Sequence, residues 1–240
     1  MTERLRLFPL NTVLFPGAVL NLHVFEPRYR QMIADCLEEG DAFGVCLIRE
    51  GDEAGDPEVM PHEIGTTARI SAMHPLEGGR FYLGTVGGSR FRITRVLERE
   101  PYLSAEVEYF SDEPVEDSSA ADALLAKIRA VFGEYLRLLV EFAGTQMDVT
   151  LPEDPVEASY LIADALQVAD SMKQRLLEME STEQRLSVEL EFLKRLLPQL
   201  RGLLERKRDV PQSERAHQPG PGGTLRADQE KFFGKHFSLN

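Results

Sequence analysis

Residue types that carry catalysis or bind metals are scattered through this sequence and form no recognised motif. The histidines are not paired with one another, and neither cysteine stands at metal-ligand spacing from a histidine. His62-Glu63 lacks the second histidine that a helical zinc-protease motif requires. The histidines are His23, His62, His74, His217 and His236.

Longer motifs for nucleotide binding and covalent catalysis are also absent from the sequence. It contains no Gly-x-x-x-x-Gly-Lys-Ser/Thr phosphate loop, no dinucleotide-binding fingerprint and no Gly-x-Ser-x-Gly nucleophile elbow. Acidic pairs such as Glu38-Glu39 and Glu153-Asp154 fall at predicted helix ends or in loops, where solvated carboxylates are the ordinary finding. We therefore expect no catalytic residue, no cofactor and no metal.

Both cysteines fall in apolar patterns. Cys36 lies on a helical stripe, and Cys46 lies in the apolar run Phe43–Ile48. Free cysteine is among the most buried residue types, and no secretory signal is present. The sequence predicts two reduced core thiols, with a disulfide or redox pair as the alternative.

The charge balance disfavours binding to nucleic acid. Twenty-seven basic residues stand against 40 acidic residues, which gives a net charge of −13. Such a chain repels phosphate backbones unless its charge is locally segregated. One basic cluster interrupts the acidic first half: Arg90, Arg92, Arg95 and Arg99. We interpret it as the solvated face of a strand, and an RNA-binding surface is the alternative.

Composition is that of a soluble globular protein, with 42% hydrophobic and 28% charged residues. No window approaches about 18 uninterrupted apolar residues, and Met1-Thr2-Glu3-Arg4 opens no apolar leader. We expect a cytoplasmic protein with no membrane partner.

Short strands dominate the first half of the chain. Apolar and polar residues alternate along most of them, as on half-buried strands. Pro9 is expected to end the first strand, because proline cannot donate to a ladder. Phe15-Pro16-Gly17 predicts a turn, and Gly87-Gly88-Ser89 predicts another. The expected strands are residues 4–8, 20–24, 43–48, 64–73, 81–86, 90–97 and 103–109.

One helix interrupts these strands. Pro27 stands at its first position, where the missing N–H costs nothing, and Gly40 is expected to end it. Its apolar stripe is Tyr29, Met32, Ile33, Cys36 and Leu37. Several short strands joined by turns, with one early helix, predict a small β-barrel or closed sheet.

The second half of the chain is expected to be helical. Asp154-Pro155 predicts a helix start, and Ser181-Thr182-Glu183-Gln184 fits a capping box. Pro198 is expected to kink or break the last helix. The apolar side of that helix is predicted to be Leu186, Leu190, Leu193, Leu197 and Leu200.

The predicted fold class is therefore α+β, with a small β-barrel first and a helical bundle after it. We place the domain boundaries at residues 1–112, 113–208 and 209–240, the last being a disordered tail rich in proline and glycine. Phe232 to Phe237 bring three aromatic residues to that tail, which favours a sticky, disordered end over a docking motif.

Four motifs, in order along the chain, carry a resemblance to a known family. They are Leu5 to Tyr29 with its two Phe-Pro dipeptides, Glu63-Ile64-Gly65-Thr66-Thr67-Ala68-Arg69-Ile70, Gly87-Gly88-Ser89-Arg90-Phe91-Arg92-Ile93, and Lys173 to Glu178 followed by Arg185-Leu186. Together they resemble the N-terminal, substrate-binding domain of Lon proteases.

This resemblance implies a PUA-like β-rich part, a helical part, and a role in recognising protein substrates. Full-length Lon proteases also carry an ATPase module and a protease domain with a Ser–Lys dyad, and the resemblance reaches neither. It therefore implies a stand-alone, non-catalytic relative of the recognition domain, with a protein or peptide as its partner.

Met73, Tyr82 and Phe91 are the candidate binding residues, each weighed against a place in the core. The ligand would be an extended segment at a sheet edge or an apolar segment on a patch. Two other functions are weighed against this one: a hydrolase with an unrecognised site, and an RNA-binding PUA-like protein. The oligomeric state is left open.

Overall fold

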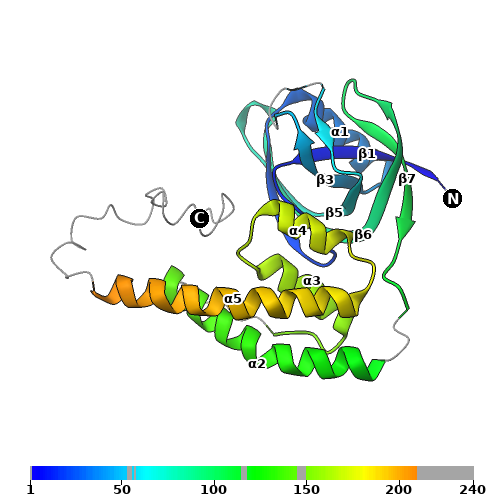
Figure 1. Cartoon of the computed structure of the whole chain (residues 1–240). Coiled ribbons are helices and arrows are strands. Elements are labelled where there is room, and N and C mark those ends of the chain that lie inside the picture. Colours follow the sequence, from blue (N-terminus) through cyan, green and yellow to red (C-terminus); the bar gives the residue numbers. More distant parts are fainter. Residues whose placement is uncertain (1, 53–55, 57, 115–117, 145–149, 210–240) are drawn as a thin grey trace. The chain divides into compact units, whose positions relative to one another are not determined.

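The computed structural model describes residues 2–52, 56, 58–114, 118–144 and 150–209 (Figure 1). The chain forms two compact units. The sheet unit is Met1–Glu113 with Asp170–Glu180, and the helical unit is Pro114–Ala169 with Ser181–Asn240. The segment at 170–180 thus groups with the strands and not with the other helices. The predicted domain boundaries stay predictions, and residues 210–240 of the tail lie outside the described residues.

Among the described residues of the first unit, seven strands make up the sheet. They are β1 (Glu3–Leu10), β2 (Val19–Val24), β3 (Phe43–Glu50), β4 (Met60–Pro61), β5 (Ile64–Pro75), β6 (Phe81–Glu98) and β7 (Ser104–Phe110). The order β1-β7-β6-β5-β3 closes on itself through the parallel pairing of β3 with β1. β2 pairs with β6, and β4 pairs with β3. The α+β class and the closed sheet are confirmed.

Two predictions about strand ends are wrong. β1 continues through Pro9 to Leu10, with Pro9 opposite Cys46 in the parallel ladder. β7 pairs with β1 only from Glu3 to Arg6, so the residues from Leu7 on have a strand partner on one side, which is β3. The nitrogen of a proline in this part of β1 can face the other side, where no ladder needs an N–H donor.

The second wrong prediction is the turn at Gly87-Gly88-Ser89, because β6 runs unbroken through these residues. Gly87 serves a close approach instead. A Cβ atom at this position would collide with the carbonyl oxygen of Phe15, and the Gly87 N–H donates to Ala18 O at 2.9 Å. Glycine is therefore needed here so that the segment before β2 can approach β6.

The predicted turn at Phe15-Pro16-Gly17 is confirmed. The Ala18 N–H donates to Phe15 O at 3.1 Å, and Gly17 has a φ of +78°. Proline at the first central position and a glycine of positive φ at the second are the requirements of a type II turn.

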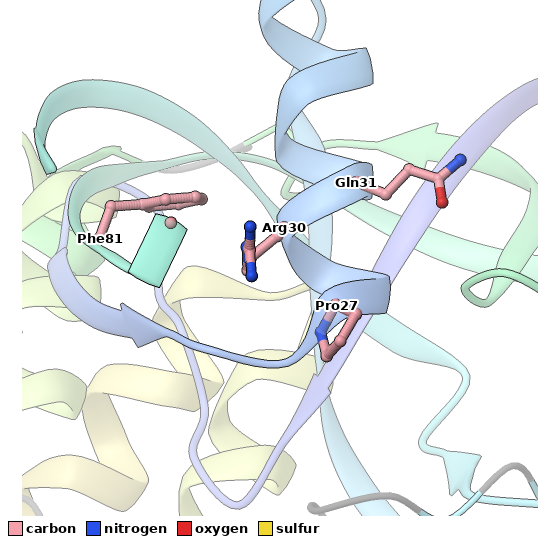
Figure 2. Close-up of a pocket in the computed structure, with 5 residues that line it drawn as sticks. Pro27, Arg30, Gln31 and Phe81 are labelled. Atoms are coloured by element: carbon pink, nitrogen blue, oxygen red, sulfur yellow. The ribbon is translucent and has the colours of Figure 1, made fainter. Parts of the chain in front are cut away.

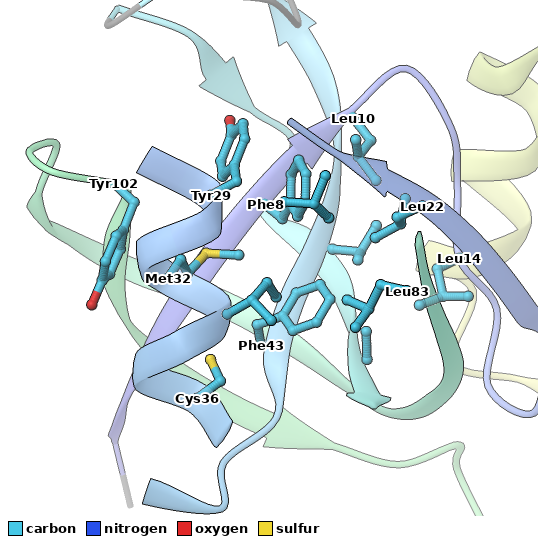
Figure 3. Close-up of a cluster of buried hydrophobic side chains, with 14 residues drawn as sticks. Phe8, Leu10, Leu14, Leu22, Tyr29, Met32, Cys36, Phe43, Leu83 and Tyr102 are labelled. Atoms are coloured by element: carbon cyan, nitrogen blue, oxygen red, sulfur yellow. The ribbon is translucent and has the colours of Figure 1, made fainter. Parts of the chain in front are cut away.

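Helix α1 (Pro27–Glu39) begins and ends as predicted, with Pro27 in its first turn and Gly40 in the left-handed conformation at its end. Four members of the predicted stripe are buried, whereas Leu37 is 47% exposed. The stripe lies against a large hydrophobic cluster (Figure 3). That cluster includes Phe8, Leu10, Phe43 and Leu83.

A second cluster lies on the other face of β1. Leu5 and Leu7 belong to it, whereas Phe8 and Leu10 belong to the first, as the alternation of side chains along a strand requires. Phe91 is fully buried in the second cluster. Its ring occupies space left by two glycines: a Cβ atom on Gly44 would lie 2.6 Å from Phe91 Cζ, and one on Gly65 would lie 2.7 Å from it.

Helix α4 (Asp170–Glu178) is attached to the sheet of its own unit by buried polar contacts. Arg90 Nη1 donates to Leu177 O and to Met179 O, both at 2.7 Å, and so satisfies carbonyls at the end of the helix. Gln174 Nε2 donates to Ile64 O at 3.0 Å. Leu176 and Leu177 add a buried apolar face.

The helical unit contains α2 (Ser118–Ala143), α3 (Pro155–Ala165) and α5 (Thr182–Asp209). Asp154 caps α3 by accepting the Glu157 N–H at 2.9 Å, and Ser181 Oγ accepts the Gln184 N–H at 3.3 Å at the start of α5. Both predicted helix starts are confirmed. The prediction at Pro198 was a kink or a break: a break is excluded, because α5 continues through this residue, and a kink stays a prediction.

Of the five leucines in the predicted stripe of α5, four are buried and Leu190 is not. Glu189 is fully buried, whereas Leu190 is only half-buried. Leu186, Glu189, Leu193 and Leu196 follow alternating steps of three and four residues, which is the spacing of a helix seam. None of the helices in the described ranges is long and apolar enough to cross a membrane.

Candidate substrate-binding surface

β2 is paired along one edge in the sheet unit. Its residues pair in register with β6, from Val19 opposite Val86 to Val24 opposite Phe81. Among the described strands β6 is its one partner. A strand with one ladder leaves alternate backbone N–H and C=O groups unpaired on its other side. These groups can pair with an added extended segment.

An aromatic patch lies along β2 and its neighbours: His23, Phe25, His74 and Tyr82. The His23 ring centroid is 5.0 Å from that of Tyr82 and 5.5 Å from that of Phe25. Tyr82 is 50% exposed and Phe25 52% exposed. Val19, at the start of β2, is the most exposed of the large apolar residues found among the described ranges. Exposed apolar side chains grouped in this way are typical of an interaction surface.

The structure places the three predicted binding residues in three different environments. Tyr82 belongs to the aromatic patch, and His74 lies opposite it in the ladder. Met73 is 44% exposed, but it pairs with the buried Leu83 and so projects from the other sheet face. Phe91 has none of its side chain exposed, so it offers no surface to a ligand.

His23 and Phe25 were not predicted as binding residues, although the sequence carries a signal for them. Leu22 and Val24 are buried, and the two aromatic residues alternate with them. The period of two therefore assigns His23 and Phe25 to the outer face. What the pattern does not show is that Tyr82, far along the chain, lies beside them.

The arginines of the basic cluster are occupied within the sheet unit. Arg90 is buried and forms an ion pair with Asp112, so its placement on a solvated face is wrong. Arg92 pairs with Glu180 at 3.0 Å, and Arg95 pairs with Glu106 at 2.6 Å. Arg99 Nη1 donates to Val59 O at 3.1 Å. Paired guanidinium groups attract phosphates weakly, since a neighbouring carboxylate cancels their field.

A pocket of about 420 Å³ lies at the end of β2, where the chain enters α1. It is lined by Pro27, Arg30, Gln31, Gly79 and Phe81. Figure 2 shows Arg30 extending from α1 toward Phe81, with Gln31 directed away from both. The pocket holds one charged group, the guanidinium of Arg30.

Both cysteines are buried, as predicted, and both are free thiols. Burial raises the pKa of Cys36 to about 11, and burial alone raises the pKa of Cys46 further. Thiols kept protonated in this way are poor nucleophiles. In the described part of the chain, no group of histidine, cysteine and acidic side chains is arranged to hold a metal ion.

The family model of the ATP-dependent protease La (LON) substrate-binding domain matches residues 4–195. The chain belongs to this family. The match extends over both structural units.

Relatives of the chain include the Lon protease of Anaeromyxobacter dehalogenans and Lon protease 2 of Myxococcus xanthus, each 28% identical over 194 residues. The alignments cover 80% of this chain but 23% of those proteins. The chain therefore matches about a quarter of the length of these Lon proteases.

Two solved structures share the fold. The crystal structure of the Lon N-terminal domain protein from Xanthomonas campestris is 28% identical, with a TM-score of 0.56, and the alignment covers 79% of this chain and 98% of that one. The N-terminal domain of the Mycobacterium avium complex Lon protease is 17% identical, with a TM-score of 0.59 and coverage of 80% and 98%. The second likeness shows the fold alone.

The motifs that carry the likeness to the Lon substrate-binding domain lie mainly in the core. Gly65 and Gly87 permit close approaches, Phe91 fills the second cluster, and Arg90 holds α4. These motifs therefore report how the domain is built.

Proposed function

We propose that this chain binds extended, apolar segments of client proteins along β2 and on the aromatic patch, and that it does so without catalysis. The observation that carries the proposal is the combination of an edge strand with exposed aromatic side chains at its end. An added strand would gain main-chain hydrogen bonds from β2, and its outward side chains would contact the patch. The membership of the Lon substrate-binding family supports a protein ligand.

The two other functions have less support from the described residues. Hydrolysis needs a nucleophile beside a base, and the cysteines are buried with raised pKa values. RNA binding needs unpaired cations, and Arg90, Arg92 and Arg95 are each paired with a carboxylate.

The test uses an unfolded client, reduced and carboxymethylated α-lactalbumin, labelled for fluorescence anisotropy. We expect the intact chain to bind it, and the variant Tyr82→Ser with Phe25→Ser to bind at least about tenfold more weakly, since aromatic anchors dominate such surfaces. Tyr109→Ser is the matched control, because Tyr109 is 41% exposed on β7, away from β2. Equal losses in both variants, or no client binding, would refute the proposal.

Pairing at the β2 edge is tested separately with three apolar peptides of the same sequence, an unmodified parent and two N-methylated forms. Each methylated form carries N-methyl groups at alternate backbone nitrogens, on one side of the strand or on the other, and so cannot donate hydrogen bonds from that side. The form methylated on the side that faces β2 should bind much more weakly than the parent. If peptides methylated on either side bind as well as the parent, the aromatic patch acts without strand addition.

A further inference from the structure

Within the described residues, the side chain of Arg30 differs from that of Arg28 in its lack of a polar partner. Arg28, two residues earlier on α1, pairs with Glu26 at 3.0 Å and lies over the Tyr29 ring. The described residues supply no hydrogen bond and no ion pair to the guanidinium of Arg30. Arg69 resembles it in this respect, but Arg69 is exposed whereas Arg30 is half-buried. A half-buried charge without a counter-ion is unusual, because desolvation costs free energy that pairing normally offsets.

The walls of the pocket make room for this guanidinium. Gly79 has a φ of +71°, which favours glycine, and a Cβ atom at this position would meet Nη2 at the flexible end of Arg30. The loop between β5 and β6 thus lies close to the guanidinium of Arg30. Phe81 supplies an apolar surface to the same pocket, and Arg30 extends toward it (Figure 2). The site therefore pairs one positive charge with one aromatic surface.

The pocket also lies where a segment added to β2 would arrive. Val24, the last residue of β2, is opposite Phe81 in the ladder, and Pro27 opens α1 three residues later. Phe81 pairs with Pro75, and Met73 projects from the same face as these two residues. A segment that follows the edge of β2 to its end would reach the pocket.

We infer that this pocket binds a single carboxylate of the client, with an apolar side chain of the client resting on Phe81. The inference rests on the proposed function, since it names a chemical feature of the segment that β2 would bind. The planar guanidinium of Arg30 matches a carboxylate with two parallel hydrogen bonds.

A phosphate fits the same pocket less well. It carries nearly two negative charges near neutral pH, and Arg30 is the one charged residue among those that line the pocket. The chain as a whole carries a net charge of −13, which repels polyanions. A single carboxylate neutralises the charge of Arg30, and an apolar group beside it can pack on the ring of Phe81.

The experiment records the arginine Nε–Hε signals of the ¹⁵N-labelled full chain during titration with small probes. N-acetyl-leucine carries a terminal carboxylate and a leucine side chain, and N-acetyl-leucinamide is its neutral match. N-acetyl-aspartyl-leucinamide carries the carboxylate on a side chain instead. The first and third probes distinguish a client's C-terminus from an internal acidic residue.

We expect the Arg30 signal to move with at least one acid and not with the neutral amide. Arg30→Gln should weaken binding of that acid at least about tenfold, since a charge-assisted pair is lost. Arg69→Gln is the control and should leave the affinity unchanged. Equal responses to acid and amide, no response of the Arg30 signal, or undiminished binding by Arg30→Gln would each overturn the inference.

The two proposals can fail independently. Small acids that bind at Arg30 in a chain that binds no unfolded client would sustain the pocket and refute the proposed function. An unfolded client that binds, with no probe discriminated by its carboxylate, would refute the pocket alone. Circular dichroism of Arg30→Gln checks that its fold is kept.

Discussion

Arg90 and Asp112 form a buried ion pair, with 2.7 Å between Nη2 and Oδ1 and 1% and 7% of their side chains exposed. The same guanidinium holds the carbonyls of Leu177 and Met179. One side chain of β6 thereby fixes α4, a helix distant in sequence, to the strands of the sheet unit.

Arg90→Gln should destabilise the sheet unit strongly. It leaves the Asp112 carboxylate buried without its counter-ion, and breaking a buried pair costs about 3–5 kcal/mol of unfolding free energy. Urea unfolding followed by circular dichroism measures the change. Arg95→Gln is the control, because its pair with Glu106 is exposed and should matter little. A comparable loss in the control would contradict the role assigned to Arg90.

Gly65→Ala should lower the unfolding free energy by about 1–3 kcal/mol through overpacking. The added methyl group would collide with Val45 O and lie 2.7 Å from Phe91 Cζ, and the backbone oxygen cannot easily move.

Gly133→Ala is the matched control for this substitution. Gly133 lies within α2 with open space around it, so alanine should stabilise the helix by about 1 kcal/mol. Opposite signs for the two substitutions are expected in thermal unfolding, and a neutral Gly65→Ala would mean that the second cluster can adjust.

Glu189 should make stability fall as pH rises above about 4.3, the ordinary glutamate pKa. Burial raises its pKa well above the ordinary value, and Arg185 opposes this only in part. The unfolded carboxyl loses its proton first, so rising pH favours the unfolded chain until the folded carboxyl also ionises. Glu189→Gln removes this effect, and its stability relative to the parent should grow by up to about 1.4 kcal/mol per pH unit in that range.

Urea unfolding of both proteins between about pH 5 and about pH 8 measures the difference. Glu191→Gln is the control on the exposed side of α5. The hydrogen bond from Lys194 lowers the pKa of Glu191, so its replacement should not reproduce the trend. A constant difference across the range would show that Glu189 ionises as easily in the folded chain as in the unfolded one.

Both native thiols should resist a disulfide reagent at about pH 8, because the raised pKa of Cys36 and Cys46 leaves little thiolate. Unfolding in urea should release two reactive thiols. Leu37→Cys places a thiol at an exposed position of α1 and should react promptly in the folded protein. Rapid modification of the unaltered folded chain would show that one of the cysteines is accessible.

Local signals in the sequence were sufficient for the helices and most strands. Pro27 and Gly40 delimit α1, and Asp154 caps α3, because capping groups and fixed φ values act over a few residues. The same local rules misplaced the strand end at Pro9 and the turn at Gly87. Whether a proline or glycine interrupts a strand depends on what the neighbouring chain requires there.

The sequence by itself determined the fold class, the family resemblance and the place of His23 on the outer face of its strand, since each depends on residue order alone. Only the tertiary structure decided that Tyr82 lies beside His23, that Phe91 and Arg90 are internal, and that Arg30 lines a pocket. The reason is physical. The burial and pairing of a side chain depend on which distant segments become its neighbours, and periodicity within one segment carries no information about them.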